Sequence, residues 1–304
     1  MQEEAHGPAM CTAAGGPHQR EVSMPSDEQV EAFQRNGYVV IPDLLSAHEL
    51  EWFGDAVDAA VTARMAWDNR QLAEKSRYEQ SFQQCLNLWE DYPEVRQLTF
   101  HPDIAAAAAQ LLGVPAIRLW HDQALYKEPG GRPTDAHQDH AYWPMRETDA
   151  ITAWIPFDGS RLAAGAMGYV PGSHRFGVRK FVNIFFDEHP YDILHGPEAR
   201  GVEPVFVEVP RGGVAFHHSL TLHVAHANHS NRTRRVHTMI FFRDGATRGA
   251  QFAHPCVDRG GVALGEPIAS AMTPLAWPRA AGELPPPPPP LREFMWGWPP
   301  PRAD

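Results

Sequence analysis

The sequence predicts a mainly β protein with helices at its N-terminal end. Between residues 26 and 112, two capping boxes and an alanine-rich segment indicate helices. From residue 116 onward, short apolar or alternating runs are separated by Gly, Pro, Asn and Asp, which is typical of a β-sandwich or barrel. No helix-length segments separate these runs, which disfavours a parallel βαβ sheet. We therefore expect a single domain in which a helical layer packs on an antiparallel β core.

The N-terminal helices are predicted from their end signals. Ser26 followed by Gln29 is a capping box, and Gly37 is a natural residue to end that helix. A short buried strand is expected at 38–41, before a proline. A second capping box, Ser46 with Glu49, opens the next helix.

A third, alanine-rich helix is predicted over Pro102–Leu112, closed by Gly113. The β core is expected over about 116–245. Its predicted strands are 117–120, 124–126, 150–156, 168–170, 205–209, 214–216 and 236–242.

Three segments are predicted to lie outside this regular core. Residues 1–25 lack periodicity and are expected to form a disordered tail, so the domain spans 26–280. The tail 281–304 contains six consecutive prolines, which favour polyproline II and offer a possible contact for a protein partner. Residues 178–204 interrupt the strand rhythm. They are expected either to cover a nearby site or to form a satellite core against the N-terminal helices.

Composition excludes several classes of protein. The chain has 304 residues, 26 basic and 37 acidic side chains, and a formal charge of −11. This acidic balance argues against binding to nucleic acid or to anionic membranes. The chain contains no run of 18 apolar residues and no apolar signal core. Three scattered cysteines form neither a disulfide framework nor a zinc ribbon. The expected location is therefore the cytoplasm.

The sharpest motif is His137-Gln138-Asp139. Residues i and i+2 of an extended chain point to the same face, so His137 and Asp139 can offer a nitrogen and an oxygen to one ion. A histidine from a distant strand would complete the two-histidine, one-carboxylate set of non-haem Fe(II) oxygenases, which leaves three positions open.

The same spacing occurs a second time, in His101-Pro102-Asp103. That motif opens the alanine-rich helix, where Asp103 suits the positive first turn. We interpret it as a helix start, which shows that the spacing alone is weak evidence for a metal site.

A downstream segment supports the metal interpretation. Five histidines crowd the residues between Phe216 and Arg235, and one of them is expected to be the third ligand: His217, His218, His223, His226 and His229. Arg234 and Arg235 follow and lead into an apolar strand. An arginine at the mouth of a barrel is a bidentate clamp for a carboxylate.

Together these residues resemble a known family. The segments HQDHAYWP, WIPFDG with GYVPGSH, and the His–Asn–Arg block, together with GYVVIPDLLSAHEL, are similar to the phytanoyl-CoA dioxygenase-like family over roughly residues 27–245. Family members are Fe(II)- and 2-oxoglutarate-dependent oxygenases, so the resemblance implies a double-stranded β-helix (jelly-roll, cupin-like) core.

The resemblance also implies site residues. In the family, the distal histidine is followed by Asn at +5 and by the oxoglutarate-binding Arg at +11. His223, with Asn228 and Arg234, satisfies both spacings, so the implied metal ligands are His137, Asp139 and His223. A register shifted to Arg235 is the alternative.

Three further positions align with the family's oxoglutarate pocket: Gln138, Trp154 and, more loosely, Gln123. Core packing is the alternative for Trp154. One departure stands out, because Ala225 occupies a position where relatives often carry a hydroxyl that bonds the cosubstrate. For Lys127 and Arg118 a solvated surface is favoured over an anion-binding role.

The implied activity is oxidation of a small molecule, possibly a secondary-metabolite intermediate, by O₂ and 2-oxoglutarate with release of succinate and CO₂. The carboxylate of Asp139 favours hydroxylation over halogenation, because related halogenases replace it with a small residue. The alternatives are an acyl-CoA hydroxylase and an inactive metal-binding jelly-roll protein. The first would need a Lys/Arg cluster, and the sequence offers only RTRR at 232–235, part of which is already assigned; the second has no use for Arg234.

Overall fold

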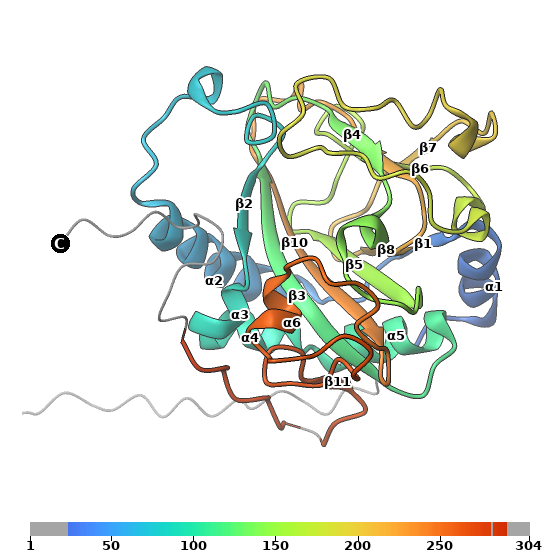
Figure 1. Ribbon diagram of the computed structural model, residues 1–304. Helices are drawn as coiled ribbons and strands as arrows, with labels where there is room; N and C mark the ends of the chain where they lie inside the picture. Colours follow the sequence, from blue (N-terminus) through green and yellow to red (C-terminus); the bar gives the residue numbers. More distant parts are fainter. Residues whose placement is uncertain (1–23, 281, 291–304) are drawn as a thin grey trace, which may run out of the picture.

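The computed structural model describes residues 24–280 and 282–290, shown in Figure 1. Nearly all of the predicted N-terminal tail lies outside the described residues, as do residues 281 and 291–304 of the proline-rich tail. The six prolines at 285–290 are described, and they lie in no helix or strand.

The first helix has the ends that its sequence predicts. α1 (Asp27–Asn36) begins after Ser26, whose side chain and that of Gln29 each accept from the other's backbone N–H. It ends at Gly37, which has a φ of 80°. This left-handed backbone costs glycine little.

The next predicted helices also form. α2 (Ala47–Met65) carries the reciprocal capping box of Ser46 and Glu49. α5 (Pro102–Leu112) ends at Gly113 as predicted. The remaining short helical segments were not predicted: η1 (Leu72–Glu74), α3 (Leu88–Asp91), α4 (Pro93–Thr99), η2 (Asp139–Tyr142), η3 (Ser173–Phe176), η4 (Pro197–Ala199) and α6 (Pro255–Asp258).

Two antiparallel sheets form the β core. The larger has the order β1-β8-β5-β10-β3-β11, with β2 also paired to β3. Its strands are β1 (Tyr38–Ile41), β2 (Gln83–Leu86), β3 (Ile117–Lys127), β5 (Ala150–Pro156), β8 (Val214–His218), β10 (Arg234–Arg243) and β11 (Leu275–Trp277). The smaller, β4-β9-β6-β7, consists of β4 (Thr134–His137), β6 (Met167–Tyr169), β7 (Val205–Val207) and β9 (His223–Ala225). The mainly β prediction is confirmed.

Strand β5 shows how the layers are arranged. All seven of its residues are buried because both of its faces are covered. Ile151, Ala153 and Ile155 pack with the helices, whereas Thr152 and Trp154 line a cavity on the opposite face. The helices thus cover one face of the large sheet, and the small sheet lies across the other (Figure 1).

Strand β3 corrects a prediction. The two strands expected at 117–120 and 124–126 are one strand, whose pairing with β10 shifts register between Leu119 and His121. Such a bulge reverses the alternation of side chains. Leu119 therefore packs with the helices, but His121 and Gln123 line the cavity. The bulge interrupts the alternation of apolar residues, and the prediction interpreted this interruption as the end of a strand.

Candidate metal centre and its cavity

Three side chains from two strand ends meet in the cavity. His137 ends β4, His223 begins β9, and the two are register partners. Gln138 keeps an extended backbone, so Asp139, the first residue of η2, points to the same side as His137. One ligand atom from each of the three lies within 4.8 Å of the others. No other such cluster of three occurs among the described residues.

Backbone contacts orient both imidazoles. His137 Nδ1 lies 2.8 Å from the carbonyl of Asp135, and His223 Nδ1 lies 3.0 Å from the carbonyl of Thr221. A carbonyl only accepts, so each Nδ1 carries the proton and each Nε2 keeps a free lone pair. Those Nε2 atoms lie 3.7 Å and 3.5 Å from Asp139 Oδ1. The three free ligand atoms therefore converge.

The other carboxylate oxygen of Asp139 is held in place. Oδ2 accepts from Thr152 Oγ1 at 2.8 Å and lies 3.2 Å from His217 Nε2. Both contacts turn Oδ1 toward the imidazoles. His217, one of the five clustered histidines, is buried against Asp139.

Electrostatics favours the protonation states that a metal needs. Burial lowers the pKa of His137 and of His223 to about 4, so both are neutral at neutral pH. Burial alone would raise the pKa of Asp139, but the imidazoles of His223, His217 and His137 hold it well below its usual range. Two neutral imidazoles and one carboxylate suit a divalent cation such as Fe(II).

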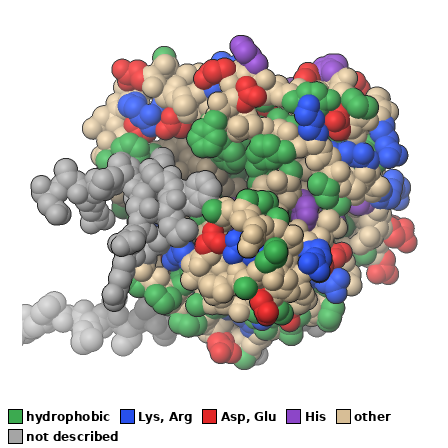
Figure 2. Space-filling view, viewed as in Figure 1, with side chains coloured by type: hydrophobic (Ala, Val, Ile, Leu, Met, Phe, Trp, Pro, Cys, Tyr) green, Lys and Arg blue, Asp and Glu red, His purple; other side chains and the backbone are tan. Residues whose placement is uncertain are grey.

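The triad lies in a cavity of about 220 Å³ between the two sheets. In the view of Figure 2 the molecule is hollowed in the middle of this face, with hydrophobic side chains gathered beside the hollow. Predicted site residues His137, Asp139, His223, Arg234, Trp154 and Gln123 all line the cavity. Tyr142 and Trp143 line it as well.

Arg234 is a buried cation without a carboxylate partner among the described residues. It is 5% exposed, and its Nη1 donates to the carbonyl of Gly165. Its Nε is buried and has no hydrogen-bond partner among the described residues. The guanidinium carbon lies 5.2 Å from the ring centre of Trp154. Burial lowers the pKa of Arg234 to about 10, which leaves it charged at neutral pH. Such a group is suited to an anionic ligand.

The neighbouring arginine is differently placed. Arg235 pairs with Asp58 and Asp158 on the outside of the sheet. The alternation of β10 therefore places Arg234, and not Arg235, in the cavity.

A second cation lies beside Arg234. Lys127 is fully buried, and the solvated surface favoured for it is wrong. Lys127 is the register partner of Arg234, and its Nζ donates to the carbonyl of Arg132. A Cβ on Gly165 would lie 2.9 Å from Lys127 Cδ and 3.4 Å from Arg234 Nη1, so the glycine gives both side chains room. Burial lowers the pKa of Lys127 to about 7. Arg118, in contrast, pairs with Asp244.

Thr134 supplies a hydroxyl opposite Ala225, the position at which relatives often carry one. It is the register partner of Ala225 across β4 and β9, it lines the cavity, and its Oγ1 is 3.5 Å from Lys127 Nζ. Sequence reasoning missed Thr134, because only strand pairing brings it opposite Ala225.

Gln138 does not line the cavity, contrary to the expectation from its alignment. Its Nε2 donates to the carbonyls of Gly177 and Leu220 at 3.1 Å and 2.6 Å, and its Oε1 accepts from the N–H of Arg179 at 2.7 Å. Since its neighbours on both sides face the cavity, alternation turns Gln138 to the opposite side. It ties down the start of the segment that follows residue 177.

That segment, 178–204, contributes to the cavity wall. It contains η4 and otherwise no helix or strand, and Ile184 and Phe185 line the cavity. The ring of Phe185 lies 4.7 Å from that of Tyr78 and 5.3 Å from that of Tyr142. Phe186 is 85% exposed. The segment packs at the cavity mouth, where its Val182, Ile184 and Ile193 form a small core with Ala136, Val170 and Leu222 rather than with the N-terminal helices.

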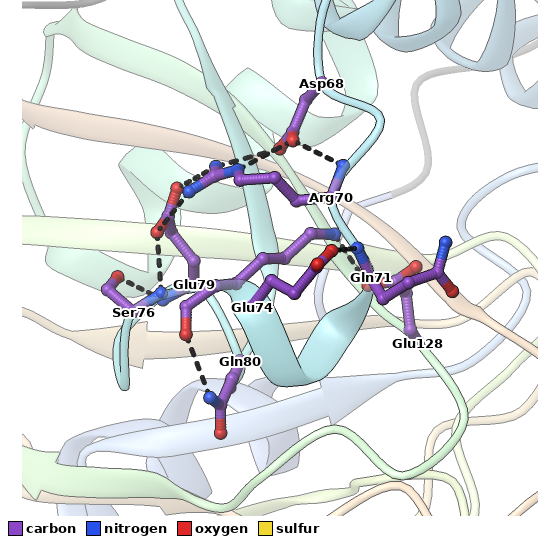
Figure 3. A network of polar contacts seen from close by, with 9 residues as sticks. Asp68, Arg70, Gln71, Glu74, Ser76, Glu79, Gln80 and Glu128 are labelled. Carbon is purple, nitrogen blue, oxygen red and sulfur yellow. Dashed lines mark hydrogen bonds and ion pairs between the residues drawn. The ribbon is translucent and has the colours of Figure 1, made fainter.

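A polar network stabilises the loop between α2 and β2, as Figure 3 shows. Arg70 binds the carboxylates of Asp68 and Glu79, and Lys75 Nζ lies 2.8 Å from Glu128 Oε2 just after β3. This loop supplies Tyr78 to the cavity, and Tyr78 hydroxyl donates to Gln84 Oε1. Gln84 in turn donates to Gln123 at 2.5 Å.

The other motif histidines have ordinary surroundings. His101 occupies the N-cap position of α5 without a side-chain cap, its Nε2 lies 3.3 Å from Glu49 Oε1, and Asp103 lies in the first turn. His226 stacks on Phe206, and His218 Nδ1 accepts from the N–H of Leu220.

Comparisons with known proteins agree with this architecture. The family model for phytanoyl-CoA dioxygenase (PhyH) matches residues 33–236.

None of the helices in the described part of the chain has the length and apolar character that a membrane span requires.

Curated relatives match parts of the chain. A probable alpha-ketoglutarate-dependent hypophosphite dioxygenase of Stutzerimonas stutzeri is 34% identical over 39% of this chain and 43% of its own length. Phytanoyl-CoA dioxygenase domain-containing protein 1 of Mus musculus is 26% identical over 48% and 52%. The chain thus spans about half the length of these relatives. A methylphosphonate hydroxylase of Gimesia maris is 28% identical over 69% and 78%.

Solved structures share the fold. The non-haem alpha-ketoglutarate-dependent carbocyclase SnoK from nogalamycin biosynthesis is 29% identical, with a TM-score of 0.70 over 86% of this chain and 99% of SnoK. EctD from S. alaskensis, with bound Fe, is 20% identical, with a TM-score of 0.58 over 72% and 77%. The jelly-roll prediction is confirmed.

Proposed function

The chain belongs to the phytanoyl-CoA dioxygenase (PhyH) family, and on that premise we propose that it is an Fe(II)- and 2-oxoglutarate-dependent oxygenase of a small molecule. The observation that carries the proposal is one cavity with two complementary ends. At one end three ligand atoms converge for a metal, and at the other a buried Arg234 has no carboxylate partner among the described residues.

His137, Asp139 and His223 would hold Fe(II). Their free Nε2 and Oδ1 atoms supply one face of a coordination sphere and leave the rest of it open. Bound there, the iron supplies the chemistry by which O₂ and oxoglutarate oxidise a substrate. The protein contributes the orientation of each ligand through Asp135, Thr221 and His217.

The far carboxylate of oxoglutarate would meet Arg234. A bidentate contact satisfies both partners, and Trp154 closes the other face of the guanidinium. Thr134 would replace the hydroxyl missing at Ala225, and Lys127 lies behind it with a pKa of about 7, so it is partly charged at neutral pH. Gln123 lines the same cavity. These contacts suit a dicarboxylate, which explains why Arg234 needs no protein counter-ion.

Hydroxylation is favoured over halogenation because Asp139 occupies a ligand position that halide would need. An acyl-CoA substrate is disfavoured, because Arg234 is the one Lys or Arg side chain among the described cavity-lining residues. The phosphates of coenzyme A would need several cations at the mouth.

Anaerobic reconstitution tests the proposal. The chain is loaded with Fe(II) and oxoglutarate, the visible charge-transfer absorption of the complex is recorded, and succinate is measured after O₂ is admitted. We expect both signals from the native chain and neither from Asp139→Ala. Iron binding without any oxoglutarate-dependent absorption or succinate would instead favour an inactive metal-binding protein.

A further inference from the structure

The cavity contains two imidazoles that neither the metal nor the cosubstrate uses. His121 lies on β3, and His254 immediately precedes α6. Both line the cavity, and His254 stacks on Trp120, the residue that precedes His121 in β3. His254 lies beyond residues 33–236, the part that the family model matches. It belongs to the C-terminal segment that follows the family-model match.

The structure defines the tautomer of His254. Its Nδ1 accepts a hydrogen bond from the backbone N–H of Cys256 at 3.3 Å, as an N-cap side chain does. A neutral imidazole whose Nδ1 accepts must carry its proton on Nε2. Stacking on Trp120, with ring centres 4.6 Å apart, fixes the plane of the ring. No described residue accepts a hydrogen bond from Nε2, so His254 offers the cavity one oriented donor.

His121 reaches the cavity because of the bulge in β3. Without the register shift at Leu119, alternation would turn His121 toward the helices. Its Nδ1 is buried without a hydrogen-bond partner among the described residues. The fold thus places a polar side chain in the part of the cavity wall that β3 forms.

Both imidazoles are uncharged at neutral pH. Burial lowers the pKa of His121 to about 4 and that of His254 to about 3, although Asp122 and Asp139 oppose the shift at His121. Much of the remaining cavity wall is aromatic or aliphatic, with Trp143, Tyr142, Phe185, Ile184, Leu86 and Ile240, and its polar members Gln84 and Thr238 are uncharged. A free cation for a second anion is therefore lacking among the described lining residues.

We propose that the substrate is an uncharged molecule with an apolar ring body and a ketone, ether or hydroxyl oxygen, and that this oxygen accepts a hydrogen bond from His254 Nε2–H. His121 lies beside it as a second polar contact. The inference rests on the proposed function, because it assigns the space left beside the iron and oxoglutarate. It separates this chain from relatives whose names specify hypophosphite or methylphosphonate, since those substrates are anions.

Two matched variants isolate the hydrogen bond. Both His254→Asn and His254→Gln remove the stacked imidazole. Asn retains an acceptor for the Cys256 N–H but is too short to donate into the cavity. Gln reaches the position of Nε2 with an amide N–H but gives up the cap.

Titration calorimetry on the full chain with Fe(II) and oxoglutarate, without O₂, measures binding of three probes. These are 1-tetralone (a neutral bicyclic ketone), tetralin (its hydrocarbon) and phenylphosphonate. One neutral hydrogen bond is worth about tenfold in affinity, so tetralone is expected to bind about tenfold tighter than tetralin. His254→Asn is expected to remove this difference, and His254→Gln to keep most of it.

Three results would overturn the inference: phenylphosphonate binding tighter than tetralone, equal losses in the two variants, or no binding of tetralone to the native chain. The charge-transfer absorption of the iron–oxoglutarate complex is recorded in the same samples. Its absence marks failure of the proposed function, whereas its presence with the wrong probe preference marks failure of this inference alone.

Discussion

Two segments of this chain share the spacing His-x-Asp and have nothing else in common. In the first, His101 immediately precedes α5 and Asp103 lies in the first helical turn. In the second, His137 ends a strand and Asp139 follows an extended residue, so both side chains reach one cavity. The local backbone decides the outcome: a helix start turns residues i and i+2 apart, and an extended chain turns them together.

The middle residue differs as well. Pro102 occupies the first turn of α5, where its missing N–H costs nothing. Gln138 instead binds the backbone at three points. The second motif thus joins the metal centre to the segment 178–204, part of which lines the cavity, while the first only begins a helix.

The largest contrast is expected in metal binding. His137→Ala removes one of three ligands. Structural zinc sites with four ligands bind with about 10–16 kcal/mol, so one ligand is worth up to about 4 kcal/mol, or up to roughly a thousandfold in affinity. His101→Ala should leave Fe(II) binding unchanged. Metal titration under anaerobic conditions measures both, and equal losses would contradict the distinction between the motifs.

Arg234→Ala is expected to weaken oxoglutarate binding and to spare the metal. Removing one partner of a desolvated charge pair costs roughly 2–5 kcal/mol, which is about 30-fold to several thousandfold in affinity. Arg235→Ala is the matched control, because Arg235 pairs with Asp58 and Asp158 away from the cavity. A loss confined to Arg235→Ala would mean that the register is shifted by one residue.

His217→Phe is expected to reduce metal affinity by about 10- to 100-fold, because the partner that orients Asp139 is lost. His218→Phe changes the adjacent residue, which has no contact with Asp139. Comparable losses in both variants would point to general damage to β8 instead of a positioning role.

Gln138→Ala is expected to loosen the segment 178–204. In the native chain, oxoglutarate with Zn²⁺ should slow amide exchange of this segment by about tenfold, or about 1.4 kcal/mol. The variant should lose that protection, because the tie to Gly177 and Arg179 is gone. Strong and equal exchange protection with and without ligand in the native chain would make the segment fixed structure and not a cover.

The smallest effect is expected at Asp103. Asp103→Asn removes a negative charge from the first turn of α5 and should lower the free energy of unfolding by about 0.3–1 kcal/mol. Oxoglutarate turnover should not change. Denaturant unfolding and succinate release test the two halves of this prediction, and reduced turnover would mean that the first motif also serves the cavity.

Much of the fold was predictable because its signals are local. α1, α2 and α5 begin at the predicted capping boxes or proline, and α1 and α5 end at the predicted glycines, since caps act within three or four residues. Strand β5 was also predicted with its observed bounds, because a continuous apolar run marks burial on both faces. Where a second element decides the structure, as for β2 on the edge of β3, the prediction failed.

The candidate site divides in the same way. The sequence alone was enough to group His137, Asp139, His223 and Arg234, because the motif spacing and the family resemblance can both be read from the order of residues in the chain. Only the tertiary structure decided that Gln138 faces away, that Lys127 is buried, that Thr134 lies opposite Ala225 and that His254 reaches the cavity. The physical reason is that strand register, a β-bulge and the return of the C-terminal segment depend on contacts between residues far apart in the chain. The residue pattern within one segment does not predict such contacts.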